Sequence, residues 1–158
     1  MIDVKIKLLD GGIMPTKAHN DDAAWDCYAR ECAVVGNKPV LIGLGFAIEI
    51  PPGYHAKIFP RSSIGLKTDL RQPNCCGIID SDYRGEVKAM YEAKVVENYI
   101  KLSDTTVKRE VFAINQYIQA GDRIAQMLIE RNEDVELVEA AELSETERGT
   151  GGFGSTGR

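Results

Sequence analysis

Residues 46–59 read Phe-Ala-Ile-Glu-Ile-Pro-Pro-Gly-Tyr-His-Ala-Lys-Ile-Phe. Apolar and polar side chains alternate before and after Pro51-Pro52-Gly53, which is the pattern of two half-buried strands joined by a turn. The same alternation runs from Val4 to Leu8, and Gly11-Gly12 closes that segment. Short alternating runs separated by glycine and proline are typical of sandwiches and barrels. We therefore predict an all-β, antiparallel fold.

One short segment resembles a helix. Residues 63–70 carry apolar side chains at helical spacing, although Gly65 lowers the helix propensity, so we expect one or two turns at most. Residues 87–120 are rich in valine and tyrosine and are predicted to form two or more strands around a charged turn at 103–106. The chain is thus expected to be almost entirely β.

The C-terminal part of the sequence changes character. Between 134 and 143 acidic and apolar residues mix without a period, and we expect Leu137, Val138 and Leu143 to cover a sheet edge. Beyond Ser144 the chain is rich in glycine and has little to bury, which predicts a mobile segment. The predicted organisation is one β domain over residues 1–143 and a tail over 144–158.

Composition narrows the function classes. The chain has 158 residues, a net charge of −5 and a pI near 5.1, so no basic surface indicates binding to nucleic acid or to an anionic membrane. The first residues contain no apolar run long enough for a signal peptide or a membrane span. Only two histidines and no Cys-x-x-Cys pair are present, which argues against a zinc site. We predict a soluble protein that binds neither nucleic acid nor membranes.

Two cysteines are adjacent in the sequence, Cys75 and Cys76. They could form a strained disulfide, but two reduced, half-buried thiols are the more common arrangement of such a pair. We predict reduced thiols and therefore a reducing, cytoplasmic compartment.

Two clusters could carry chemistry. Residues 60–65 place Arg61, Ser62 and Ser63 at a strand end, where a guanidinium, hydroxyls and turn amides could bind phosphate, although such turns also serve as surface loops or helix caps. Residues 77–86 combine two carboxylates, a tyrosine and an arginine between glycines. A carboxylate there could act as a base or a metal ligand, and the alternative is a hairpin with solvated charges.

A third cluster is the glycine-rich tail, residues 148–157, which carries an arginine, a phenylalanine and two hydroxyls. Such a segment could fold over a nucleotide, with amides on phosphate and the ring on a base. The alternative is a low-complexity end without a ligand.

Taken together, the clusters resemble the five ordered motifs of the homotrimeric dUTPase family from about Ile2 to Gly157. The matching segments, in order, are Ala24-Trp25-Asp26-Cys27-Tyr28-Ala29, Pro60 to Gly65, Gly77 to Glu86, Gly121-Asp122-Arg123-Ile124-Ala125-Gln126, and Arg148 to Gly157. The resemblance implies a distorted jelly-roll-like β-barrel. It also implies hydrolysis of dUTP to dUMP and pyrophosphate, which limits uracil in DNA and supplies dUMP for dTMP synthesis.

The resemblance also implies residue roles. Asp80 would activate the attacking water as general base and meet the deoxyribose 3′-hydroxyl. Tyr83 would lie against the sugar and exclude a ribose 2′-hydroxyl, which requires a chain turn near Ser81-Asp82 so that both side chains reach one ligand. Uracil would be read by backbone groups between Asn74 and Ile79, including Gly77.

The remaining implied roles concern the triphosphate. Arg61, Ser62 and Gln126 would hold the α- and β-phosphates, with support from Ser63. In the tail, Phe153 would stack on uracil, and Arg148, Gly154, Ser155 and Thr156 would reach the γ-phosphate. Asp26 would orient Mg²⁺ through water, and three subunits would contribute to each site of a homotrimer.

The sequence departs from the family pattern in two places. Trp25 and Cys27 replace the usual residues beside Asp26, so the backbone there could run differently. The link over 87–120 is longer than usual and resembles an insertion. Phage-encoded members often carry extra segments, and some bind other proteins through them. By this analogy we predict a phage- or prophage-type member with a regulatory protein partner bound through 87–120.

Three other functions fit parts of the sequence. A dCTP deaminase shares the fold and the Arg-Ser-Ser turn, but its third motif has Pro-Gly-Trp where this chain has Ser81-Asp82-Tyr83. A nucleotide-gated protein could have as its main role the binding of a regulator through 87–120, with hydrolysis secondary or slow. A purely structural jelly roll would leave Asp80, Gln126 and Phe153 without a role.

Overall fold

The structure is a computed structural model that describes residues 2–101, 107–113 and 115–152; for 95–101 and 107–113 it describes the backbone alone. The strands are β1 (Lys5–Leu8), β2 (Trp25–Tyr28), β3 (Ala33–Val35), β4 (Val40–Glu49), β5 (Tyr54–Pro60), β6 (Leu70–Arg71), β7 (Gly77–Ile79), β8 (Glu86–Ala93), β9 (Val95–Lys101), β10 (Val107–Ala113), β11 (Gln116–Ile118) and β12 (Arg123–Arg131). The helix among the described residues is α1 (Ser62–Lys67). The all-β prediction is confirmed.

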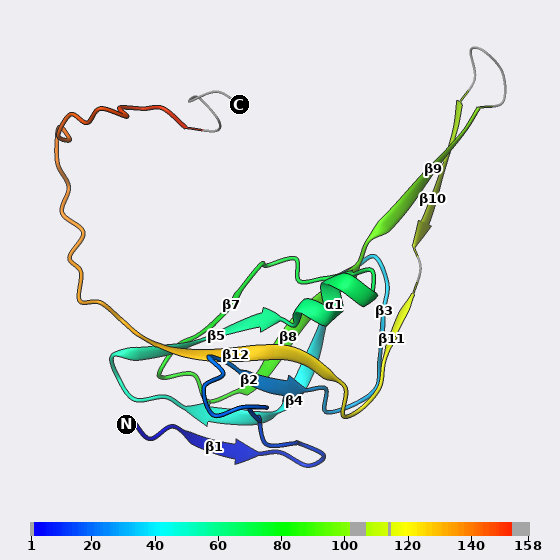
Figure 1. Cartoon of the computed structure of the whole chain (residues 1–158), viewed down its shortest axis with the longest axis horizontal. Helices are drawn as coiled ribbons and strands as arrows, with labels where there is room; N and C mark the ends of the chain where they lie inside the picture. Colours follow the sequence, from blue (N-terminus) through cyan, green and yellow to red (C-terminus); the bar gives the residue numbers. More distant parts are fainter. Residues whose placement is uncertain (1, 102–106, 114, 153–158) are drawn as a thin grey trace.

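Two four-stranded antiparallel sheets form the body (Figure 1). One sheet has the order β1-β4-β8-β6, and the other has the order β2-β12-β5-β7. Buried side chains from both sheets, among them Phe46, Tyr91, Ile58 and Ile124, form one core. The Tyr91 hydroxyl donates a hydrogen bond of 2.6 Å to the Ile124 carbonyl and so ties β8 to β12. Packing in this core fixes the positions of β2, β5, β7 and β12, on or beside which candidate site residues lie.

The three predicted strands are present. Residues 5–8 form β1, residues 46–49 lie in β4 and residues 56–59 lie in β5. The predicted turn between the last two is closed by a hydrogen bond from the Tyr54 amide to the Pro51 carbonyl, and Gly53 there has a φ of +83°. Glycine adopts that left-handed conformation without a steric penalty. The alternation in the sequence therefore located these strands correctly.

The helix differs from its predicted bounds. Helix α1 begins one residue earlier than expected, directly after β5, and ends before Leu70. Leu70 instead pairs with Ala93 across β6 and β8. The Thr68 hydroxyl donates to the Ile64 carbonyl at 2.6 Å and helps to close the helix. Long-range strand pairing thus overrides the local helical spacing of Leu70.

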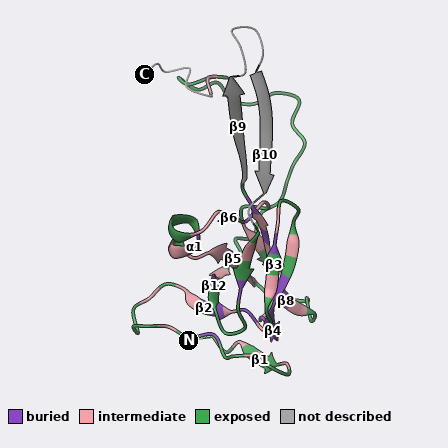
Figure 2. Cartoon of the chain, turned by 90° about the vertical axis from the view of Figure 1, so that its right-hand side faces the viewer, coloured by how far each residue is buried: buried purple, intermediate pink, exposed green. Residues whose placement is uncertain are grey.

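The region 87–120 contains several strands, as predicted. Strands β9 and β10 pair with each other from Val95↔Ala113 to Lys101↔Val107. Their two-stranded sheet projects from the body (Figure 1). Figure 2 shows where buried residues lie within the body itself. The predicted charged turn at 103–106 lies outside the described residues.

Beyond β12 the chain leaves the body. Residues 133–150 are exposed, and Figure 1 shows this segment arching away from both sheets. The expectation that Leu137, Val138 and Leu143 cover a sheet edge is wrong within one chain, because these side chains are 96%, 77% and 88% exposed. We call residues 133–143 the arm. No helix of the described ranges is long and apolar enough to cross a membrane.

Candidate active site

Three motif residues meet at one end of the sheet β2-β12-β5-β7. Gln126 on β12 lies opposite Asp26 on β2 and opposite Phe59 on β5, one strand on each side. Arg61 follows the end of β5. A cavity of about 340 Å³ elsewhere is apolar, whereas the cavity at this end, about 530 Å³, is lined by Asp26, Arg61, Arg123 and Gln126. We call it the arginine cavity.

The carboxylate of Asp26 organises the arginine cavity. Asp26 is 8% exposed, and its Oδ1 accepts a hydrogen bond of 2.8 Å from Arg61 Nε. Its Oδ2 accepts one of 3.1 Å from Arg123 Nη1. Charge-assisted bonds to a buried carboxylate fix the direction of each guanidinium. The site therefore presents two oriented cations, a suitable arrangement for phosphate oxygens.

Arg123 was missed as a site residue by sequence reasoning. It lies within the fourth motif, in which the family resemblance implies a role for Gln126 alone. The register shift in the β12–β2 pairing between Arg123 and Ala125 is a long-range feature. The sequence signal that could have identified Arg123 is its place three residues before Gln126 in the same motif. Both residues line the arginine cavity.

The two predicted serines begin α1. Ser63 Oγ lies 3.5 Å from Arg61 Nη1, at the limit of a hydrogen bond, and Ser62 is exposed. Arg61 itself is the residue that precedes the helix. The turn thus keeps the Ser63 hydroxyl close to the Arg61 guanidinium.

Asp80 and Tyr83 meet at a second place. Together with Ile79 they line a cavity of about 280 Å³, which we call the tyrosine cavity. The Tyr83 amide donates to the Asp80 carbonyl at 3.2 Å, so the chain turns at Ser81-Asp82. The predicted turn is confirmed, and it brings both side chains to one side.

The loop before β7 has an unusual backbone. Cys75 has a φ of 60°, a conformation that residues other than glycine rarely adopt. Its amide donates to the Gln72 carbonyl at 3.0 Å, and the Cys76 amide donates to the Asn74 carbonyl at 2.6 Å. Asn74 is exposed, and Gly77 opens β7 opposite Ile58. This tight loop presents backbone groups next to the sheet.

The two cavities lie at opposite ends of β5. Ile79, which precedes Asp80, pairs with Ala56 near the start of β5, whereas Arg61 follows its end. Ala56 and Arg61 are five residues apart, which corresponds to roughly 17 Å along a strand. The two cavities share no lining residue. One chain therefore does not bring Asp80 and Arg61 together.

Among the described residues of the tail, Arg148 lines neither cavity. Arg148 Nε donates to the Gly151 carbonyl at 2.8 Å within the tail itself. Phe153, Gly154, Ser155 and Thr156 lie outside the described residues.

The described residues offer no protein cage for a metal ion, because no group of three or more His, Cys, Asp or Glu side chains gathers among them. Beside Asp26, burial and the aspartate charge raise the pKa of the Cys27 thiol to about 12. A neutral thiol is a poor ligand and a poor nucleophile. The available donors are carboxylate oxygens, which suit a hard cation that keeps most of its water. Such a donor set fits Mg²⁺ carried by a polyphosphate.

Comparison with known proteins assigns the family. The family model for dUTPase matches residues 10–157. The chain belongs to the dUTPase family. A deoxyuridine 5′-triphosphate nucleotidohydrolase of Hydrogenobaculum sp. (strain Y04AAS1) is 41% identical over 153 residues, which is 96% of this chain and 94% of that protein. The enzyme of that name from Nocardia farcinica (strain IFM 10152) is 37% identical over 156 residues, 98% of this chain and 85% of that protein.

Solved dUTPase structures share the fold. Staphylococcus bacteriophage 80alpha dUTPase, solved with dUpNHpp, has a TM-score of 0.80 and 28% identity, with full coverage of both chains. A mutant dUTPase of S. aureus phage phi11, described for its coordination of a structural Mg(II) ion, has a TM-score of 0.71 and 25% identity and covers 89% of this chain and 98% of that one. The jelly-roll-like dUTPase fold expected from the sequence is thereby confirmed.

Proposed function

We propose that this dUTPase-family chain hydrolyses dUTP to dUMP and pyrophosphate, and so limits uracil in DNA and supplies dUMP. The observation that carries the proposal is the turn that places Asp80 and Tyr83 in one cavity. A carboxylate beside a ring that can pack on a sugar is the arrangement that the reaction requires.

Asp80 is the proposed general base. Its side chain is exposed at the end of β7, where water can reach it. It takes a proton from the water that attacks the α-phosphorus, while its second oxygen meets the deoxyribose 3′-hydroxyl. Tyr83 packs against the sugar, and its ring leaves no room for a 2′-hydroxyl. Pyrophosphate leaves, and no covalent intermediate is needed.

Base recognition falls to the loop before β7. Backbone groups of residues 74–79, including Asn74, Gly77 and Ile79, read uracil by imitating base pairing. The pairing of Gly77 with Ile58 holds this loop on the sheet. Backbone donors and acceptors at fixed positions give specificity without charged side chains.

The arginine cavity is the proposed phosphate site. Arg61, Ser62 and Gln126 bind the α- and β-phosphates with support from Ser63, and Arg123 adds a second guanidinium. These preorganised donors stabilise the charge that develops on the leaving pyrophosphate. Asp26 keeps the two cations in place before the substrate arrives.

Mg²⁺ is the proposed cofactor, and Asp26 is the residue that would orient it through water. When bound, the ion would neutralise charge on the triphosphate. Both Asp26 oxygens already accept arginine hydrogen bonds, and each oxygen retains acceptor capacity for a water molecule.

We propose that the active chain is a homotrimer with shared sites. The separation of the tyrosine and arginine cavities along β5 supports this proposal. A substrate that contacts both kinds of cavity must bind the tyrosine cavity of one copy and the arginine cavity of another. Tail residues Arg148, Phe153, Gly154, Ser155 and Thr156 would close over a site built by neighbouring copies, with Phe153 on the base and the others at the γ-phosphate.

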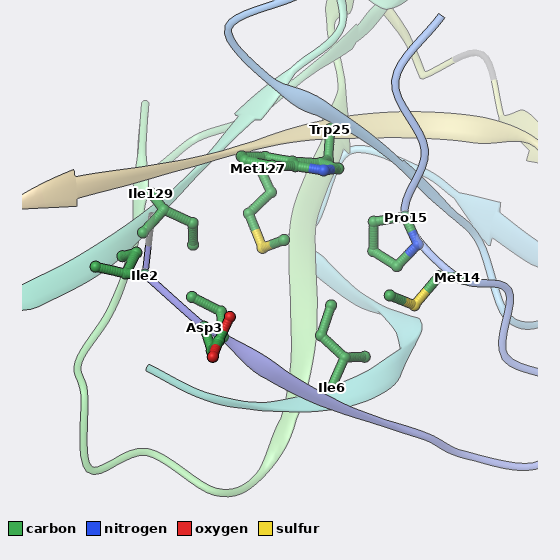
Figure 3. Close-up of a pocket in the computed structure, with 9 residues that line it drawn as sticks. Ile2, Asp3, Ile6, Met14, Pro15, Trp25, Met127 and Ile129 are labelled. Atoms are coloured by element: carbon green, nitrogen blue, oxygen red, sulfur yellow. The ribbon is translucent and has the colours of Figure 1, made fainter. Parts of the chain in front are cut away.

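The exposure of the arm, residues 133–143, supports a trimer in which the arm of one copy packs on a neighbouring copy. Its apolar side chains are exposed, and β1 lies at the edge of its sheet. Beside β1 the apolar cavity of about 340 Å³ is lined by Ile6, Trp25, Met127 and Ile129 among others (Figure 3). Exposed apolar patches of this kind commonly mark contacts between subunits. The apolar side chains of an arm from a neighbouring copy match the apolar lining of this cavity.

Substrate profiling tests the proposed function. The purified protein with Mg²⁺ is expected to release pyrophosphate from dUTP much faster than from dCTP, dTTP or UTP. The reason is that the loop of residues 74–79 selects uracil and the Tyr83 ring selects deoxyribose, while Asp80 acts as general base on the nucleotide that satisfies both. Ammonia release from dCTP, measured in the same samples, separates a deaminase from a hydrolase. Turnover of none of the four nucleotides would contradict the proposal.

The β9–β10 hairpin is the proposed docking element for a regulatory protein. Its described residues, 95–101 and 107–113, form a separate two-stranded sheet that projects from the body, so its removal leaves both main sheets intact. We expect that replacing residues 95–113 by a short turn leaves kcat for dUTP near the wild-type value, as measured by pyrophosphate release. A large loss of kcat would place the hairpin in the catalytic machinery instead.

A reducing, cytoplasmic compartment remains the proposed location. Cys27, Cys32, Cys75 and Cys76 are all free thiols in the structure, which supports this proposal. Retention of full dUTP turnover after long incubation in a reducing buffer, with loss under oxidising conditions, is the expected behaviour.

A further inference from the structure

Gly85 lies beneath the ring of Tyr83. A Cβ atom added at Gly85 would stand 2.6 Å from Cζ and 3.0 Å from Cε2 of that ring. Such approaches do not occur between real atoms, so an alanine here and the present ring position exclude each other. Gly85 is not among the glycines with positive φ. The backbone would therefore accept alanine, and the position of the ring is what requires glycine.

The ring is held from one side. The Tyr83 hydroxyl donates to the Glu86 carbonyl at 3.0 Å, while the residue is 43% exposed. Tyr83 and Asp80 both line the tyrosine cavity. A side chain at Gly85 would thus displace the ring from its present position beside the cavity.

Glu86 gives the ring a fixed acceptor. Its carboxylate accepts a hydrogen bond of 3.2 Å from the Gly45 amide and lies 3.3 Å from Arg30 Nε, and its side chain is 12% exposed. A Cβ at Gly43 would come within 2.9 Å of Glu86 Cδ, so the irregular part of β4 makes room for this carboxylate. The start of β8 is therefore anchored to the neighbouring strand.

We propose that Gly85 is a positioning residue that determines sugar specificity, because it lets the Tyr83 ring fold back to the Glu86 carbonyl. The inference rests on the proposed function of Tyr83 in excluding ribonucleotides. Steric exclusion of one hydroxyl depends on where the ring lies to within a fraction of an ångström. Seating the ring on bare backbone fixes that position.

The test compares sugar discrimination in Gly85→Ala and wild type. The ratio of kcat/KM for dUTP to kcat/KM for UTP is expected to fall by about tenfold in Gly85→Ala, as the displaced ring no longer blocks the 2′-hydroxyl. Tyr83→Phe keeps the ring but loses the bond to Glu86, and it should lower the ratio less. Thermal melting of each variant, measured in parallel, reports whether the fold is kept.

A second background separates positioning from general damage. In Tyr83→Ala the ring is absent, so adding Gly85→Ala should leave the ratio unchanged, giving strong non-additivity between the two positions. An unchanged ratio in Gly85→Ala alone, or an equal loss in both backgrounds, would overturn the role of Gly85. Wild-type turnover of dUTP is measured first, so failure of the proposed function is recognised separately.

Discussion

Replacing Asp80 by asparagine is expected to lower kcat for dUTP by about 10²–10⁴-fold, the usual contribution of a positioned general base. The amide has the shape of the carboxylate and can still contact the 3′-hydroxyl, but it cannot accept the proton of the attacking water. Substrate binding, measured by calorimetry with a non-hydrolysable dUTP analogue, should change little. The loss therefore appears in kcat rather than in affinity.

The matched control for Asp80 is Asp82. Both carboxylates stand on the same turn and both are exposed, but Asp82 is not among the residues that line the tyrosine cavity. Asp82→Asn removes the same charge and should keep kcat near the wild-type value. Near-normal turnover in Asp80→Asn would remove Asp80 from the role of base, and equal losses in both variants would point to the charge of the turn instead.

Deleting residues 148–158 is expected to lower kcat/KM for dUTP by about 100-fold or more while the protein stays folded. The deleted segment contains a single large apolar residue, Phe153, so little buried surface is lost and the melting temperature should hardly move. Function falls because the γ-phosphate contacts and the cover over the base are removed. Stability and activity are thus expected to separate.

A narrower measurement examines the same tail without truncation. In Phe153→Trp, fluorescence should change when a non-hydrolysable dUTP analogue and Mg²⁺ are added, and far less with dUMP, which has no γ-phosphate to hold the tail. The same titration of the unaltered chain corrects for Trp25, the single native tryptophan. If the truncated protein keeps its normal kcat/KM, the tail has no part in catalysis.

Much of the fold follows from local sequence pattern. The alternation in residues 46–50 and 56–59 predicts strands because each has one buried and one exposed face. Leu70 shows the limit of this reasoning, since it has helical spacing but pairs with Ala93, a partner that lies far along the chain. The arm shows another limit. Its apolar residues are predicted to cover a sheet edge, yet within one chain they are exposed.

The candidate site residues can be named from the sequence, but their arrangement in space cannot. The motifs point to Asp80, Arg61 and Gln126, whereas the separation of Asp80 from Arg61 depends on how β7 pairs with β5. Two further contacts are visible only in the structure. Asp26 accepts hydrogen bonds from both Arg61 and Arg123, and the Tyr83 ring packs against Gly85. Side-chain contacts across strands are long-range, and a single sequence does not specify them.

In the proposed trimer, Asp80 and Arg61 from different copies complete one active site. Two variants that are each inactive, Asp80→Asn and Arg61→Ala, are co-expressed with different tags, and mixed trimers are isolated by both tags. In a cyclic trimer of either composition, one of the three junctions pairs an intact Asp80 with an intact Arg61, so about a third of wild-type dUTP turnover is expected. Turnover no higher than that of the parent variants would contradict the account.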